Sequence, residues 1–288
     1  MSLIPASLFT RIRNSITRRG SSGEKVFFMH LPKTGGTSID AALRANYQSL
    51  NLRNDKILMH RHDSIAAAKM VSVMHGYDYE RGEGDDSNVL RYGVEHLAYL
   101  MSLPRTRYIS GHMVFDKSMY DSFKNEFKFI TVLRDPVQRL LSFYYYIRYR
   151  NNNRGRFNID TSLAEFLSSD LGKAQGFEYV KYYGGIKANQ EMYQTDEAVA
   201  SAIKNVDSFD VVGLLENLGQ LKSDIKREFN MSLDIKYKKT SPAPKGSRER
   251  ELSSEERHMI KDVCKWDYQV YAHARTMVQG RKVKSSCG

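Results

Sequence analysis

The sequence predicts an α/β fold, a P-loop-like parallel sheet flanked by helices. Three observations support this class. Short apolar runs of strand length alternate along the chain with helical patterns. Several of these runs end in polar residues, and one is followed by a Gly-Gly turn that opens a helix. The composition, 288 residues with 41% hydrophobic and 27% charged, is globular and excludes collagenous, disulfide-scaffold and wholly disordered chains.

The first half of the chain repeats a strand, loop and helix unit. A buried strand is expected at 25–30 (KVFFMH), followed by a turn at 32–38 (PKTGGTS) and a helix from Ile39. Further strands are expected at 107–110 and 127–133. The last of these stops at Arg134-Asp135-Pro136, and the proline suits the first turn of a following helix.

The remaining elements follow the same pattern. We expect helices at 64–73, 94–103, 163–168, 191–204, 215–229 and 253–274, a strand at 209–213 and an acidic loop at 78–87. The predicted organisation is a basic segment at 1–22, one domain at 23–280 and a polar tail at 281–288.

The net charge limits the kinds of ligand that the protein is expected to bind, and the cysteine content indicates its compartment. A net charge of +11 attracts anions, including nucleic acid, acidic polysaccharide, anionic lipid and phosphorylated small molecules. Only Cys264 and Cys287 are present, which fits a reducing, cytoplasmic compartment. The basic segment 1–22 is expected to lie on the body of the protein; contact with a membrane surface is the alternative. No apolar run reaches the roughly 20 residues that cross a bilayer.

Three loops fall at the carboxyl ends of predicted strands, where open α/β sheets bind ligands: 30–38, 111–115 and 134–139. The first has the residue types of a phosphate cradle. The glycines let the backbone wrap an anion, hydroxyls stand at the helix N-terminus, and Lys33 adds a point charge. An ordinary nucleotide-triphosphate loop has its lysine after the last glycine, whereas Lys33 precedes Gly35-Gly36.

Two segments resemble the sulfotransferases that use 3′-phosphoadenosine 5′-phosphosulfate (PAPS). FFMHLPKTGGTS is similar to their 5′-phosphosulfate loop, and VLRDPVQRLLSFYYYIRY to their 3′-phosphate segment. YYYIRY, FDVVGLLENL and KKTSP are also similar to the carbohydrate branch that contains heparan sulfate 2-O-sulfotransferase. The resemblance spans roughly residues 25 to 275.

The resemblance implies a set of cofactor-binding residues and no metal. They are Lys33, Thr34, Gly35, Gly36, Thr37 and Ser38 for the phosphosulfate, Arg134 and Ser142 for the 3′-phosphate, and Lys238, Lys239, Thr240 and Lys245 in a loop that closes over the nucleotide. Lys33 is also implied in catalysis, because its ammonium can stabilise charge on the leaving phosphate.

His112 is the expected general base among eight histidines. It ends a predicted strand on the ligand side, and SGHMVF resembles the branch's segment with the catalytic histidine. That branch has His-Gly-His, and Ser110 replaces the first histidine here.

Two further groups of residues, histidines and tyrosines, are not expected to form a metal site or a nucleic-acid site. His60, His62 and His75 lack a second ligand pair at zinc-like spacing, so we expect acceptor binding or surface exposure instead of a metal. The tyrosines at 144–149 are expected to pack in the core with a basic rim, although such a run can also stack nucleic-acid bases.

The leading hypothesis is a PAPS-dependent O-sulfotransferase. The expected acceptor is a hydroxyl-bearing glycan or glycolipid, acidic ones included, and nucleic acid is not an expected partner. The alternatives are a P-loop kinase-like phosphotransferase and a non-catalytic module that binds polyanions or nucleic acid. The kinase is disfavoured by the position of Lys33 before the glycines.

Overall fold

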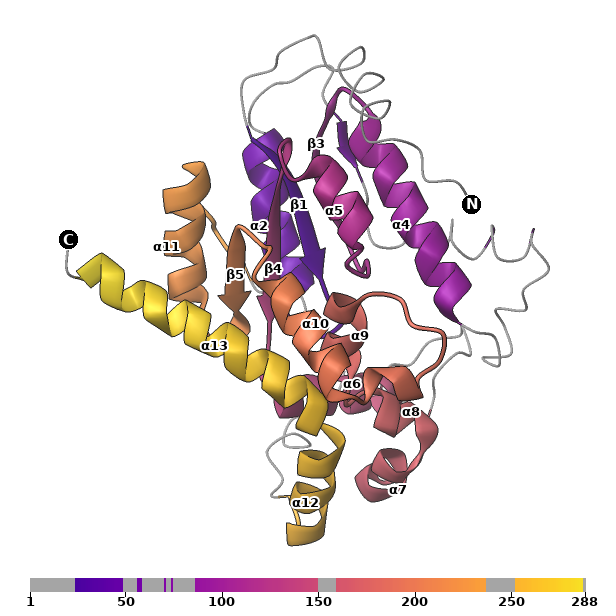
Figure 1. The fold of residues 1–288 in the computed structure, drawn as a ribbon. Coiled ribbons are helices and arrows are strands. Elements are labelled where there is room, and N and C mark those ends of the chain that lie inside the picture. The colour runs from indigo at the N-terminus through magenta and orange to yellow at the C-terminus, as the bar shows by residue number, and fades with distance from the viewer. Residues whose placement is uncertain are drawn as a thin grey trace.

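The computed structural model describes residues 24–48, 56–58, 70, 74, 86–149, 159–236 and 252–286. At its centre lies a parallel sheet of five strands in the order β2-β3-β1-β4-β5 (Figure 1). The strands are β1 (Lys25–His30), β2 (Lys56–Leu58), β3 (Thr106–Gly111), β4 (Phe127–Leu133) and β5 (Val211–Leu214). The predicted α/β class is confirmed.

The helices, with two 3₁₀ turns, alternate with these strands. They are α2 (Gly36–Gln48), α4 (Asp86–Ser102), α5 (Lys117–Phe123), α6 (Pro136–Tyr149), α7 (Leu163–Ser168), α8 (Asp170–Ala174), α9 (Glu178–Gly184), η1 (Glu191–Tyr193), α10 (Asp196–Val206), η2 (Leu215–Asn217), α11 (Leu218–Phe229), α12 (Ser254–Val263) and α13 (Lys265–Ser286).

Both faces of the sheet are covered. On one face, α2 and α11 pack on residues such as Phe28 and Ile130. On the other, α4, α5, α9, α10 and α13 pack on residues such as Phe27 and Phe129. Burial on both faces explains why β1 and β4 are continuous apolar runs with little alternation in polarity.

A third apolar cluster lies beyond the carboxyl ends of the strands, where α6, α7 and α12 meet (Figure 1). The α6 tyrosines Tyr144 and Tyr145 are buried in it, while Arg148 is partly exposed. The expectation of core packing with a basic rim is therefore confirmed over this part of α6. The helix puts Ser142 at the end of its second turn, close to the sheet edge where ligands bind in such folds.

Several expected boundaries were wrong. The helix expected at 253–274 is two helices that meet at Cys264. The helix expected from 191 starts at Asp196 because Thr195 caps it, accepting a hydrogen bond from the Ala198 amide at 3.1 Å. The last residues of the expected acidic loop 78–87 already belong to α4.

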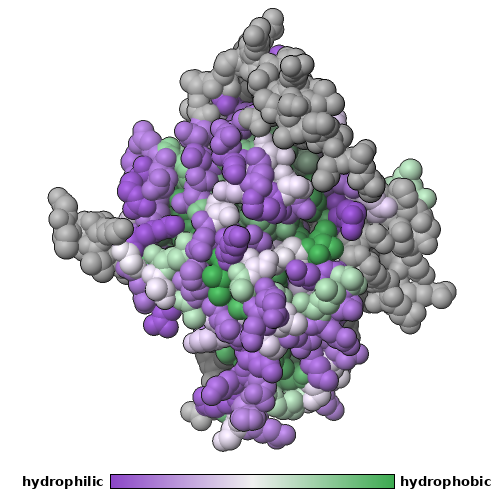
Figure 2. Space-filling view, viewed as in Figure 1, coloured by the Kyte–Doolittle hydropathy of each residue, from purple (hydrophilic) through white to green (hydrophobic). Residues whose placement is uncertain are grey.

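The visible surface is mainly hydrophilic, with small separate hydrophobic areas (Figure 2). Large exposed apolar or aromatic side chains include Tyr99, Met192 and Tyr268. Within the described ranges, no helix is both long and apolar enough to cross a bilayer. The basic segment 1–22, His60, His62, His75 and the loop with Lys238, Lys239, Thr240 and Lys245 lie outside the described residues.

Candidate functional site

The connection from β1 to α2 forms a tight loop with two residues of positive φ. Lys33 has φ 70° and Gly35 has φ 78°, and the fully buried Thr34 between them donates its hydroxyl to the Leu31 carbonyl at 2.9 Å. The Ser38 amide then bonds the Gly35 carbonyl at 3.1 Å as α2 begins. The hydroxyl of Thr34 thus closes the turn, and the first amides of α2 point out of a helix N-terminus, which favours anions.

Packing explains why both glycines are needed. A Cβ on Gly36 would lie 2.1 Å from Nδ1 of His30, the last residue of β1. A Cβ on Gly35 would lie 2.5 Å from Cδ1 of Leu215, which follows β5. The loop therefore approaches its neighbours more closely than any other residue type allows.

Lys33 connects this loop to the segment after β4. Its Nζ lies 3.8 Å from the ring centroid of Tyr146 in α6, a cation–π contact. Its carbonyl accepts a hydrogen bond from Nη1 of Arg134 at 3.3 Å. Two of the predicted segments, the glycine loop and the Arg134 segment, are therefore in direct contact.

Arg134 is held by a tyrosine from α9. The hydroxyl of Tyr179 accepts from the Arg134 amide at 2.9 Å and donates to the Arg134 carbonyl at 2.5 Å. Tyr179 is fully buried, whereas Arg134 is partly exposed. Ser142 is also buried, eight residues along in α6.

A buried polar cluster fixes the start of α9. One carboxylate oxygen of Asp267 accepts from the amides of Tyr179 at 2.7 Å and Val180 at 3.1 Å. Arg139 of α6, fully buried, lies 3.9 Å from the other oxygen and donates to Gln175. Burial raises the pKa of Asp267 to about 8, and the Arg139 guanidinium opposes this shift. The cluster joins α6, α9 and α13 behind Arg134.

His112 follows β3 at the same sheet edge. Its Nδ1 lies 2.5 Å from the backbone carbonyl of His30, and the two imidazole centroids are 4.5 Å apart in an edge contact. Because a carbonyl only accepts, Nδ1 carries the hydrogen, and Nε2 is the acceptor nitrogen of the neutral ring. A ring in this form is suited to take a proton from a hydroxyl.

Ser110, two residues before His112, has a structural role. Its hydroxyl donates to Asp40 of α2 at 2.5 Å, and the hydroxyl of Tyr108 donates to the same oxygen at 2.9 Å. Asp40 also pairs with Arg44 at 2.7 Å. These bonds fasten β3 to α2.

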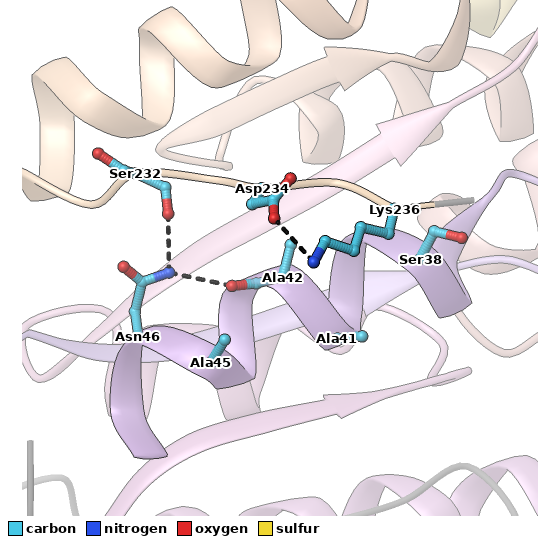
Figure 3. Close-up of a pocket in the computed structure, with 8 residues that line it drawn as sticks. All are labelled: Ser38, Ala41, Ala42, Ala45, Asn46, Ser232, Asp234 and Lys236. Carbon is cyan, nitrogen blue, oxygen red and sulfur yellow. Dashed lines mark hydrogen bonds and ion pairs between the residues drawn. The ribbon is translucent and has the colours of Figure 1, made fainter. Parts of the chain in front are cut away.

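A pocket of about 320 Å³ runs along the outer side of α2 (Figure 3). It starts at Ser38, beside the glycine loop, and its far wall is the segment 232–236. Asn46 donates to the Ser232 carbonyl at 3.1 Å and so ties this wall to α2. Lys236, the last described residue of the wall, leads toward Lys238 and Lys239.

The structure thus brings together the predicted residues of three loops, at the carboxyl ends of β3, β1 and β4. His30, Tyr146 and Tyr179 were missed. His30 ends an apolar strand just as His112 follows one, and that parallel was the available signal. In the described part of the chain, no group of three or more His, Cys, Asp or Glu residues is arranged to hold a metal.

One comparison with known proteins assigns the chain to a family. The family model described as "Sulfotransferase domain" matches residues 23–195, more than half of the chain. The matched region includes Lys33, His112, Arg134 and Ser142. A search of curated proteins found no match. This match covers more than half of the chain and includes the strand, glycine-loop and helix unit with its lysine before the glycines, and it identifies the chain as a member of the sulfotransferase family.

Proposed function

We propose that this sulfotransferase moves the sulfuryl group of PAPS to a hydroxyl of a carbohydrate-type acceptor. The products are an O-sulfate ester and adenosine 3′,5′-bisphosphate. The observation that carries the proposal is the 3.3 Å hydrogen bond from Arg134 to the carbonyl of Lys33. It joins the residues proposed for the two phosphorylated ends of the donor.

The donor would be held at three points. The amides of the Gly35-Gly36 loop and the ammonium of Lys33 bind the 5′-phosphosulfate. Arg134 and Ser142 bind the 3′-phosphate with charge-assisted hydrogen bonds. The nucleoside would lie beside Ser38, where the pocket along α2 begins, with Lys238, Lys239, Thr240 and Lys245 closing over it.

The transfer step uses the residues of adjacent loops. Nε2 of His112 takes the proton of the acceptor hydroxyl while its oxygen attacks sulfur. The bond from sulfur to the 5′-phosphate oxygen breaks, and the electron pair stays on the phosphate. Lys33 and the loop amides stabilise the charge that develops there. No metal ion is required in this scheme.

The net charge of +11 supports an acidic glycan or glycolipid as the acceptor. The enzyme would act in the cytoplasm, with the basic segment 1–22 on the body of the protein or, as the alternative, in peripheral contact with a membrane. Labelled sulfate transferred from PAPS to a panel of neutral and acidic glycans tests the acceptor class. Transfer only to phenols or to protein tyrosine would refute the carbohydrate acceptor.

Nucleotide discrimination tests the donor site by calorimetry. A charge-assisted bond to phosphate is worth roughly 1.5 to 3 kcal/mol, and 1.4 kcal/mol is a factor of ten. The wild type should therefore prefer adenosine 3′,5′-bisphosphate to adenosine 5′-phosphate by at least about tenfold. Arg134→Ala should lose most of this preference, and the exposed control Arg105→Ala should keep it.

Other outcomes favour the alternatives. Equal affinity for the two nucleotides, or a strict requirement for magnesium, would support the phosphotransferase. Binding of neither nucleotide, together with tight and salt-sensitive binding of polyanions, would support the non-catalytic module.

A further inference from the structure

The side chain of His30 stands between the proposed base and the phosphate loop. It is 3% exposed and belongs to β1, the central strand of the sheet. Its imidazole contacts the ring of His112 edge-on, with 4.5 Å between centroids and 68° between planes. Its Nδ1 lies 2.1 Å from where a Cβ on Gly36 would be. One buried ring thus touches both parts of the site.

We propose that His30 is a positioning residue for His112, acting from the neighbouring strand of the sheet. This inference rests on the proposed role of His112 as general base. It adds a residue to that role, and His30 itself does not contact the reacting atoms.

His30 makes two separate contacts with the imidazole ring of His112, one through its backbone and one through its side chain. Its backbone carbonyl contacts Nδ1 of His112 at 2.5 Å, which selects the tautomer. That contact orients the Nδ1 side of the ring of His112. The imidazole of His30 supplies the second contact, which fixes the plane of the ring and the direction of Nε2.

The imidazole of His30 is itself held in position because it packs against two further residues. Its ring stacks on Phe28, two residues earlier on the same side of β1, with 4.9 Å between centroids. On the other side stands Gly36, where any larger residue would displace it. The register of β1 with β3, in which Met29 pairs with Gly111, puts the next residues of both strands at one level.

Single-turnover transfer at saturating PAPS provides the kinetic test. A misplaced catalytic group costs up to about 10²-fold in rate, so His30→Leu should slow transfer 10- to 100-fold. Its dissociation constant for adenosine 3′,5′-bisphosphate should stay within about threefold. His30→Phe keeps a planar ring and should recover most of the rate. The matched control His258→Leu removes an exposed imidazole in α12 and should behave as wild type.

A double-variant cycle separates positioning from general damage. If His30 acts through His112, then His30→Leu should cost nothing further in a His112→Gln background. An equal loss in both backgrounds, or a Phe variant as slow as the Leu variant, would overturn the proposal.

A second readout does not depend on activity. In the full chain labelled with ¹⁵N at histidine, His112 should show a single tautomer protonated at Nδ1, assigned by its loss in His112→Gln. In His30→Leu the backbone carbonyl still selects this tautomer, but the ring of His112 loses its edge contact, so its ¹⁵N signals should show exchange broadening that the wild type lacks. If the wild type fails to transfer sulfate but this change occurs, the role of His30 stands and the proposed function fails. Ring signals of His112 that are as sharp in His30→Leu as in the wild type would refute the positioning role whatever the activity.

Discussion

Lys33 combines a costly backbone conformation with a charged side chain in a tight site. A non-glycine residue with φ 70° costs roughly 1 to 2 kcal/mol, and such strain is typical of functional sites. Two hydrogen bonds stabilise this conformation. The buried Thr34 donates its hydroxyl to the Leu31 carbonyl, and Arg134 donates to the Lys33 carbonyl. The ammonium is therefore presented by a rigid loop, which is what electrostatic stabilisation of a leaving group requires.

Replacement of Lys33 tests that role. Lys33→Ala should lower single-turnover transfer by about 10²-fold or more, the scale of losing one stabiliser in a closed site. The exposed Lys173→Ala in α8 is the matched control and should be unchanged. A Lys33→Ala protein that transfers sulfate at the wild-type rate would contradict the assignment.

Substitution of Gly36 should also be damaging, although glycine has no side chain that could take part in the reaction. In Gly36→Ala the new methyl would meet the ring of His30 at 2.1 Å, so the loop or the ring must move. We expect unfolding stability to fall by about 1 to 3 kcal/mol, as for other overpacked sites, and transfer to fall at least about tenfold. Gly280→Ala in α13 has open space at this position and should be neutral or stabilising by up to about 1 kcal/mol. Denaturant titration and single-turnover rates measure both effects, and an unaffected Gly36→Ala would refute the close packing.

Sequence motifs predicted the residues that follow strand ends, and they missed those that meet across the fold. Lys33, His112 and Arg134 each follow an apolar run, so local pattern was enough. Tyr179 reaches Arg134 from a short helix 45 residues away, and no local pattern reports such a contact. Ser110 was expected only as a missing histidine, and its bond to Asp40 gives it a structural role.

At the scale of elements, α9 acts as a support for the segment after β4. Its first turn is bound to Asp267 of α13, and its Tyr179 bonds both backbone groups of Arg134. The break between α12 and α13 at Cys264 belongs to the same arrangement, because Asp267 bonds the Gly176 carbonyl through its amide at 3.3 Å. A single straight helix was expected because no Gly or Pro interrupts 253–274, and the break follows from this tertiary contact.

Tyr179→Phe isolates this support. Loss of the hydroxyl leaves the amide and carbonyl of Arg134 without their present partner, which should cost about 1 to 3 kcal/mol of unfolding free energy. We also expect weaker binding of adenosine 3′,5′-bisphosphate with little change for adenosine 5′-phosphate, because the 3′-phosphate is proposed to lie on Arg134. Tyr268→Phe, which changes an exposed tyrosine of α13, is the control. Equal loss for both nucleotides would show that Tyr179 serves the fold alone.

The strands were predicted best because burial on both faces makes them uniformly apolar. The expected ranges 25–30 and 127–133 are the observed β1 and β4. The three-residue β2 and the seven-residue α5 and α9 were missed because short elements carry little periodicity. The six-residue α7 was nevertheless expected at its observed bounds, 163–168.

For the molecule as a whole, the sheet needs elements from both ends of the chain. The family match stops at residue 195, yet β5, α11 and α13 lie beyond it and complete the sheet and its two covering layers. The interior they enclose contains several groups that ionise at alkaline pH. They are Cys264, Tyr108, Tyr179 and Tyr183. Burial raises the pKa of all four, that of Cys264 to about 12.

From these buried groups we predict that the unfolding free energy falls at alkaline pH by a calculable amount. The folded state keeps protons that the unfolded chain releases above about pH 9 to 10, so the stability is complete below that range and declines as pH rises. Each such group should contribute about 1 kcal/mol of loss per pH unit between pH 10.5 and 11.5. Tyr183, whose hydroxyl lies 2.6 Å from that of Thr131, provides the test. In denaturant titrations at several pH values across this range, the unfolding free energy of Tyr183→Phe should fall less steeply with pH than that of the wild type. The difference in slope should correspond to about one proton. The exposed Tyr99→Phe should match the wild-type slope. Identical slopes for all three proteins would mean that Tyr183 ionises without unfolding, and that the core around β4 and α9 admits water.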